Sequence, residues 1–181
     1  MDEIDQVAEA RLTKRGFVVS DAQARDDLES RGYGDAGKRT LLLKDYEALY
    51  LLYTERLDIP GDKKKISFND VVEYAFKRDA LAWTKFLIYR DLRSRGYVPK
   101  EGFGFGADFR VYERGDYGAK AAKFVIFGVN EGTEIPVSNL SKSVRQISRM
   151  GKVPIVAVVD RRGEVIYYRL SRANFPKIER T

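Results

Sequence analysis

The segment Tyr97–Tyr112, YVPKEGFGFGADFRVY, contains glycines at positions 102, 104 and 106. Closely spaced glycines are typical of loops that bring backbone N–H groups up to a phosphate. Such a loop follows a strand and opens a helix. Here the glycines lead into Ala107–Tyr112, where apolar and polar residues alternate as they do in a half-buried strand. The glycines therefore predict a break between two strands and exclude a nucleotide-binding loop.

The chain of 181 residues contains no histidine and no cysteine. Without histidine it lacks the usual acid–base group at neutral pH and the commonest metal ligand, and without cysteine it lacks thiolate sites and disulfides. We therefore expect no metal and no cofactor. The formal net charge of +6 gives a modest attraction to polyanions.

Length and hydropathy bound the class of protein. A chain of 181 residues can form one large domain or two small ones. The longest apolar run, Val153–Val159, is too short to cross a bilayer, and the N-terminus Met1–Asp5 is acidic, unlike a signal peptide. We expect a cytoplasmic protein with no membrane segment.

The second half of the chain predicts helices and strands in alternation. Apolar residues at helical spacing predict an amphipathic helix over Leu81–Arg95, ended by Gly96, with Arg90, Arg93 and Arg95 on its solvent side. The remaining predicted elements are strands at Tyr97–Val98, Ala107–Tyr112, Phe124–Val129 and Val153–Val159, a helix over 138–152, and a hairpin over Asp160–Leu170.

The first half predicts a separate small domain. Its predicted elements are a hairpin formed by Val7–Leu12 and Phe17–Ser20, a helix from Ser20 or Asp21 to Ser30, a strand at Arg39–Lys44, a helix capped by Asp45 and running to Arg56, and a helix over Ser67–Lys77. Leu49, Leu52, Tyr53 and Leu57 are predicted core residues. Lys77–Asp79 marks the predicted boundary between domains 1–78 and 79–181.

The order of these elements resembles the archaeal tRNA-splicing endonuclease family, most strongly over Leu81–Leu170. The resemblance rests on the strand GYV after a helix, the strand GFGADFRVY, the apolar strands FVIFGV and VPIVAVV, and the hairpin DRRGEVIYYRL. It implies an α+β protein, in which a small N-terminal domain precedes a nuclease-like domain with a mixed sheet packed on helices.

The resemblance also implies a metal-independent cleavage of RNA. In the family a tyrosine removes the ribose 2′-hydroxyl proton, a histidine protonates the leaving 5′-oxygen, and a lysine stabilises the negative charge. The products are a 2′,3′-cyclic phosphate and a 5′-hydroxyl. The matching positions hold Tyr112, Ala121 and Lys152. General acid catalysis is worth roughly 10²–10⁴ in rate, so we expect the isolated chain to be a poor nuclease.

The alanine at position 121 has two explanations. A histidine-to-alanine variant of a catalytic chain is one. The other is natural loss, which we favour because Gly118–Ala122 and the segment Gln146–Arg149 also depart from the family pattern. We therefore predict a structural subunit that supports a catalytic homologue acting on precursor tRNA, in a hetero-oligomer of α2β2 type. The alternatives are a nuclease that uses Tyr112 and Lys152 without histidine, and a non-enzymatic RNA-binding module.

Further residues acquire roles through the resemblance. Arg145 takes the position of a family arginine that packs against RNA bases. Asp160 and Glu164 match an acidic docking loop, and Val165 and Tyr167 belong to a strand that pairs two nuclease domains. The alternatives are an ordinary solvent-exposed hairpin, an edge-strand aromatic at Tyr112 and a solvated helix-end cation at Lys152.

Overall fold

The computed structural model describes residues 7–104 and 106–176, so Met1–Asp5 and Phe105 of the glycine-rich segment lie outside the described residues. Two five-stranded mixed sheets and the helices packed on them form an α+β fold of two domains, which confirms the predicted class. The position of the boundary at residues 78 and 79 stays a prediction. None of the described helices has the length and apolar character needed to cross a membrane.

The N-terminal domain is built on a sheet of order β3-β4-β2-β1-β5. Its strands are β1 (Ala8–Thr13), β2 (Gly16–Val19), β3 (Asp35–Ala36), β4 (Leu41–Leu43) and β5 (Leu57–Asp58), and its helices are α1 (Ala22–Ser30), α2 (Asp45–Tyr53) and α3 (Phe68–Arg78). The predicted hairpin is confirmed, with Thr13 opposite Gly16. The predicted caps of α1 and α3 are also confirmed, since the Asp21 side chain accepts a hydrogen bond from Ala24 and Ser67 caps α3.

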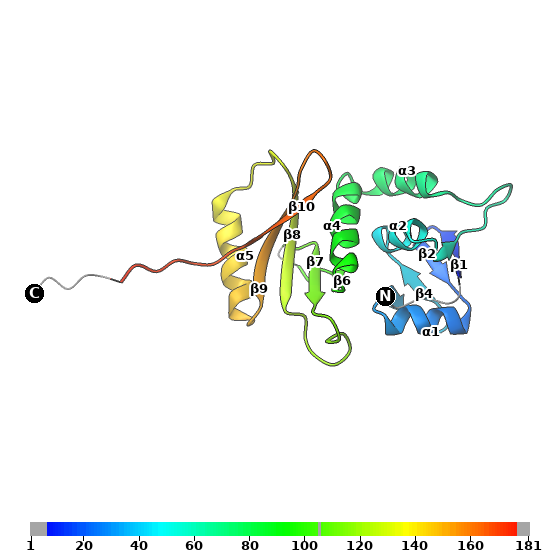
Figure 1. Cartoon of the computed structure of the whole chain (residues 1–181), viewed down its shortest axis with the longest axis horizontal. Coiled ribbons are helices and arrows are strands. Elements are labelled where there is room, and N and C mark those ends of the chain that lie inside the picture. The colour runs from blue at the N-terminus through cyan, green and yellow to red at the C-terminus, as the bar shows by residue number, and fades with distance from the viewer. Residues whose placement is uncertain (1–6, 105, 177–181) are drawn as a thin grey trace, which may run out of the picture.

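The C-terminal domain has a sheet of order β10-β9-β8-β7-β6, in which β8 and β9 run parallel. Its strands are β6 (Val98–Glu101), β7 (Phe109–Tyr112), β8 (Phe124–Asn130), β9 (Val153–Val159) and β10 (Val165–Arg169), and its helices are α4 (Ala82–Ser94) and α5 (Val137–Arg149). Figure 1 shows α5 on one side of this sheet and α4 between the sheet and the N-terminal domain.

The two domains share one continuous core. Tyr46 and Tyr50 of α2 contact the buried Tyr89 of α4 at ring-centroid distances of 4.9 and 5.7 Å, and Tyr46 also meets Phe109 of β7 at 5.1 Å. Gly32 allows the loop after α1 to approach β6, because a Cβ there would collide with Val98. A large apolar interface of this kind fixes the relative position of two domains.

A buried ion pair lies inside this interface. Glu47 of α2 is 1% exposed and Lys100 of β6 is 6% exposed, with 3.7 Å between the carboxylate and the ammonium group. Glu47 also accepts hydrogen bonds from the backbone N–H groups of Gly34 and Lys44, and Lys100 donates to the Gly34 carbonyl over 2.6 Å. Burial raises the pKa of the Glu47 carboxyl, an effect that Lys100 opposes.

Arg93 corrects the expectation for α4. It was predicted on the solvent side, yet its guanidinium lies 3.9 Å from the centre of the Tyr33 ring and donates to the Arg31 and Gly32 carbonyls. It also donates to the hydroxyl of Tyr89. The planar guanidinium has enough donors for all three acceptors, so a helix cation joins the two domains instead of meeting water.

Helix α2 and its surroundings differ from prediction in smaller ways. The N-cap is Lys44 and not Asp45, because Glu47 reaches back to the Lys44 N–H. The helix ends at Tyr53, whose side chain is exposed and was wrongly expected in the core, whereas Leu49 and Leu57 are buried as predicted. The short strands β3 and β5 were not anticipated, since two residues carry no periodic pattern.

The buried pair generates a test of stability. We expect Lys100→Met to lower the free energy of unfolding by about 3 kcal/mol at pH 7.5, because it leaves the buried Glu47 carboxylate without its cation. The loss should be smaller at pH 5, because without Lys100 the already raised pKa of Glu47 rises further and the carboxyl takes up a proton in the folded state. Urea unfolding at both pH values measures this, with the exposed Lys38→Met as control.

Candidate functional site

Tyr112 lies at the end of β7, where the strand pairing determines its position. Its partner across the sheet is Val98 of β6, and the preceding residue Val111 is buried opposite Phe124 of β8. Alternation along the strand therefore leaves Tyr112 half-buried on the other face. Its ring meets that of Tyr117 edge-on at 5.2 Å.

The parallel register of β8 and β9 brings Lys152 to the loop that contains Ala121. Phe124 lies opposite Val153, so the residues just before these strands are neighbours. The Val153 N–H donates to the Lys123 carbonyl, and the Lys152 ammonium donates to the Ala122 carbonyl over 2.5 Å. The ammonium also lies 5.8 Å from the centre of the Phe103 ring. The sheet itself thus positions this cation beside the loop.

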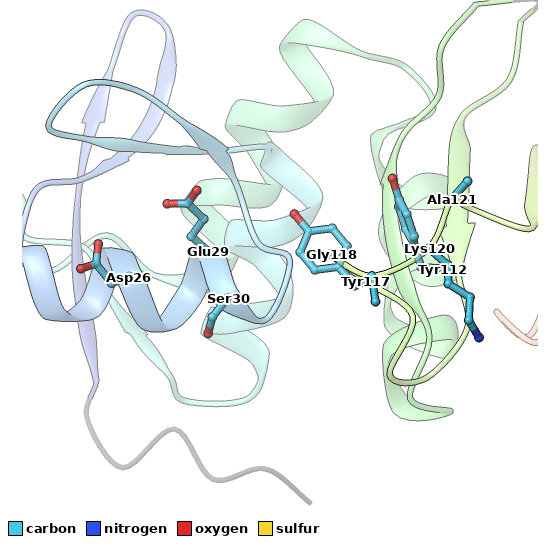
Figure 2. A pocket seen from close by; sticks show the side chains of 9 residues that line it. Asp26, Glu29, Ser30, Tyr112, Tyr117, Gly118, Lys120 and Ala121 are labelled. Carbon is cyan, nitrogen blue, oxygen red and sulfur yellow. The ribbon is translucent and has the colours of Figure 1, made fainter.

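Tyr112 and Ala121 line one shallow cavity of about 780 Å³ between α1 and the loop after β7. Figure 2 shows Tyr117 projecting from this loop toward α1, with Asp26 and Glu29 on the helix across from it. Lys120, the cation of the lining, is held by Asp116 at 2.8 Å. The cavity therefore has two tyrosines, Tyr112 and Tyr117, on one side and the carboxylates of Asp26 and Glu29 on the other. We call these two carboxylates the acidic wall.

Two features of this cavity disfavour the binding of phosphate and the donation of a proton. The Glu29 carboxylate has no ion-pair partner among the described residues and repels an anion, whereas Asp26 is already paired with Arg25 at 2.9 Å. The methyl group of Ala121 cannot donate a proton. Burial, followed by the neighbouring Tyr112 and the carboxylate of Glu29, raises the pKa of the Tyr117 hydroxyl. Tyr117 is thus a neutral phenol at pH 7 and a poor proton acceptor.

Arg145 lies apart from this cavity. It is exposed on α5 and lines a different groove, of about 700 Å³, together with Val144 and the segment Leu170–Arg172. The structure therefore brings Tyr112 and Ala121 into one cavity and Lys152 next to Ala122, and it leaves Arg145 outside. The assignment of an RNA-binding role to Arg145 stays a prediction.

The final hairpin presents an edge strand. Asp160 accepts hydrogen bonds from the Arg162 and Glu164 N–H groups and so shapes the turn. Within β10, Val165 and Tyr167 pack against the core, and the Tyr167 hydroxyl donates to Asp91 over 2.7 Å.

The outward residues of the same strand are Ile166 and Tyr168, which are 47% and 52% exposed. Strand β10 is the last strand of its sheet, so one of its edges has no strand partner among the described residues. An edge with outward apolar side chains can accept a further strand. The roles of Asp160, Glu164, Val165 and Tyr167 in an interface remain predictions.

Four further residues surround the site and were not predicted from the sequence. They are Asp26, Glu29, Phe103 and Tyr117. Asp26 and Glu29 belong to a short helix of ordinary polar composition. Their position opposite Tyr112 follows from the domain interface, which no local pattern records.

Comparison with known proteins gives two family matches. Residues 8–72 match the family described as tRNA intron endonuclease, N-terminal domain, and residues 82–167 match tRNA intron endonuclease, catalytic C-terminal domain. The chain is similar to the tRNA-splicing endonuclease of Pyrococcus furiosus, with 33% identity over 81% of this chain and 84% of the relative.

Two further relatives bear the same description. The tRNA-splicing endonuclease of Methanococcus vannielii is 32% identical over 89% of this chain and 92% of its own length. That of Thermococcus onnurineus is 32% identical over 89% of this chain and 93% of its own length. The similarity therefore spans both domains.

The acidic wall generates a test of local electrostatics. We expect the double substitution Asp26→Asn/Glu29→Gln to tighten binding of a fluorescent oligoribonucleotide, used as a polyanion, by about threefold at low salt and by less at about 0.2 M salt. Fluorescence anisotropy measures the affinity. The exposed pair Asp62→Asn/Glu73→Gln removes the same charge far from the cavity and is the control. Equal gains in both would show a general charge effect instead of a local one.

Proposed function

The chain belongs to the tRNA intron endonuclease family, and from this premise we propose that it is a structural subunit of a tRNA-splicing endonuclease. In this role it supports a catalytic homologue that removes introns from precursor tRNA. The observation that carries the proposal is the complete absence of histidine from the sequence, with Ala121 at the position of the family's general acid. Loss of that acid costs roughly 10²–10⁴ in rate.

The surroundings of Ala121 support the same role. Asp26 and Glu29 face the cavity that Tyr112 lines, where a catalytic chain needs an environment that accepts phosphate. The ammonium of Lys152 is already engaged by the Ala122 carbonyl. The remaining groups therefore have structural partners inside the chain: Tyr117 for Tyr112, and a backbone carbonyl for Lys152.

The free edge of β10 supports association with a homologue. A partner strand would complete the backbone hydrogen bonds of this edge, and other parts of the partner would cover Ile166 and Tyr168, which project from the face of the sheet. We propose a hetero-oligomer of α2β2 type in which the partner keeps its histidine.

A second candidate function is that of a slow, histidine-independent nuclease, or of a catalytic chain altered at position 121. The observation in its favour is that Tyr112 and Lys152 both still lie beside the loop that contains Ala121. In that case Tyr112 is the base and Lys152 stabilises the charged phosphorane, a role for which an ammonium is suited.

Reconstitution tests the structural role. The chain is mixed with a histidine-containing family member from the same organism, and excision of an intron from precursor tRNA is followed by gel electrophoresis. We expect the chain alone to be inactive, the mixture to be active, and the complex mass to match two copies of each chain. Full activity of the chain alone, or an unchanged substrate range of the homologue without it, contradicts the proposal.

Substitutions within the assembled complex separate the two candidates. We expect Tyr112→Phe and Lys152→Met each to leave the excision rate within about threefold, because neither group does chemistry in a structural subunit. We expect Ala121→His to leave the isolated chain inactive as well, with Ala119→His in the same loop as its control. A gain of about 10² or more in the Ala121→His chain alone would establish the catalytic alternative.

A further inference from the structure

A second groove continues from the Tyr112 cavity along the junction of the two domains. It encloses about 650 Å³ and shares Ser30 and Tyr117 with that cavity. The N-terminal domain contributes one wall, and the end of α4, β6 and the loop after β7 contribute the other. Its lining residues are Ser30, Arg31, Tyr33, Tyr50, Arg56, Arg93, Ser94, Arg95, Gly96, Tyr97, Val98, Arg114, Gly115 and Tyr117.

Charge distinguishes this groove from its neighbour. Of the residues that the structure describes, five arginines and no acidic residue line it, whereas Asp26 and Glu29 line the Tyr112 cavity. The arginines come from both domains, so the positive surface exists only because the domains are packed together. We call this surface the arginine groove.

The arginines of the groove divide into engaged and available groups. Arg93 is committed to two carbonyls and the Tyr89 hydroxyl, and Arg95 is paired with Asp91 at 2.8 Å. Arg31 is paired with Asp27 at 3.0 Å.

Arg56 and Arg114 differ from these three. Within residues 7–104 and 106–176 neither guanidinium has a carboxylate in ion-pair range, and Arg114 is exposed. Arginine is suited to a planar, two-point contact with a phosphate. These two residues stand on opposite walls of the groove, one on each domain.

Aromatic rings complete the groove. Tyr33 and Tyr50 stack at 6.5 Å with an angle of 19° between their planes, and Arg93 packs on Tyr33 from the C-terminal domain. Tyr97 and Tyr117 belong to the other wall. Burial raises the pKa of the Tyr33 and Tyr50 hydroxyls, so both remain neutral hydrogen-bond donors. Tyr33 is only 4% exposed and packed against Arg93 and Tyr50, so it supports the wall from within. The half-buried Tyr50, Tyr97 and Tyr117 can contact the sugars and bases of a strand while the cations bind its phosphates.

We propose that the arginine groove binds a single-stranded segment of RNA, with Arg56 and Arg114 each contacting a backbone phosphate. The proposal rests on the proposed function, since it gives the structural subunit a direct hold on the RNA substrate. The positive lining alone would also attract an acidic peptide. The half-buried Tyr50, Tyr97 and Tyr117 favour RNA, because they offer surface for bases and riboses that a run of carboxylates does not use.

The test measures the salt dependence of binding. A fluorescent single-stranded oligoribonucleotide is titrated with the chain between about 0.05 and 0.2 M salt, and its anisotropy gives the affinity. For Arg56→Ala/Arg114→Ala we expect the slope of log K against log salt to fall in magnitude by about 1.4, as for two lost phosphate contacts on a single strand. The control is Arg15→Ala/Arg39→Ala, which removes the same charge from exposed positions outside the groove and should leave the slope unchanged.

Folding is controlled separately. Arg114→Ala alone alters an exposed side chain and should reduce the slope by about 0.7. Urea unfolding checks that each variant is folded.

Three outcomes overturn the proposal. These are an unchanged slope in folded Arg114→Ala and in the double variant, an equal change in the Arg15/Arg39 control, or tighter binding of an acidic peptide of equal charge than of RNA.

Assembly with the catalytic homologue is measured independently by mass. If Arg56→Ala/Arg114→Ala assembles, supports excision and binds RNA normally, the groove proposal fails while the proposed function stands. If the unaltered chain does not assemble with the homologue but the slope of the variants changes as expected, the proposed function fails while the groove proposal stands.

Discussion

The buried contact between Glu47 and Lys100 ties the two domains together inside their shared core. Each of these charges requires the other, because neither is solvated, and they belong to different domains. The backbone N–H of Gly34 donates to Glu47, and its carbonyl accepts from Lys100. These two hydrogen bonds hold the loop after α1 against β6. Both interdomain hollows take one wall from each domain, so their shapes depend on the interface to which this contact and the surrounding aromatic core both contribute.

The same architecture explains why Tyr112 and Lys152 lie close to Ala121, whether or not they take part in catalysis. Lys152 reaches the loop through the parallel register of β8 and β9, which is set by apolar residues along both strands. Tyr112 is held by β6 and by the Tyr117 ring. A sheet of this topology preserves the geometry of a site whether or not its chemistry is used, so proximity alone is weak evidence for activity.

Local pattern predicted the regular elements well and the charged interior poorly. The helix over α4 and the strands β7, β8 and β9 were predicted because apolar periodicity decides them, and the Ser67 cap was visible in the sequence. Glu47, Lys100 and Arg93 look like ordinary surface charges in sequence, since their burial depends on residues at least 50 positions away. The acidic wall opposite Tyr112 was missed for the same reason, and the position of Tyr53 was wrong because α2 turns that residue toward solvent.

The two adjoining hollows differ in charge along the interdomain junction, since arginines line one and the carboxylates of Asp26 and Glu29 belong to the other. A polyanion that enters the junction is drawn toward Arg56 and Arg114 and repelled at Asp26 and Glu29. If the arginine groove binds RNA as proposed, the carboxylates of Asp26 and Glu29 disfavour extension of the strand toward Tyr112. In the proposed assembly, the scissile bond then lies at the partner chain and not at the Tyr112 cavity.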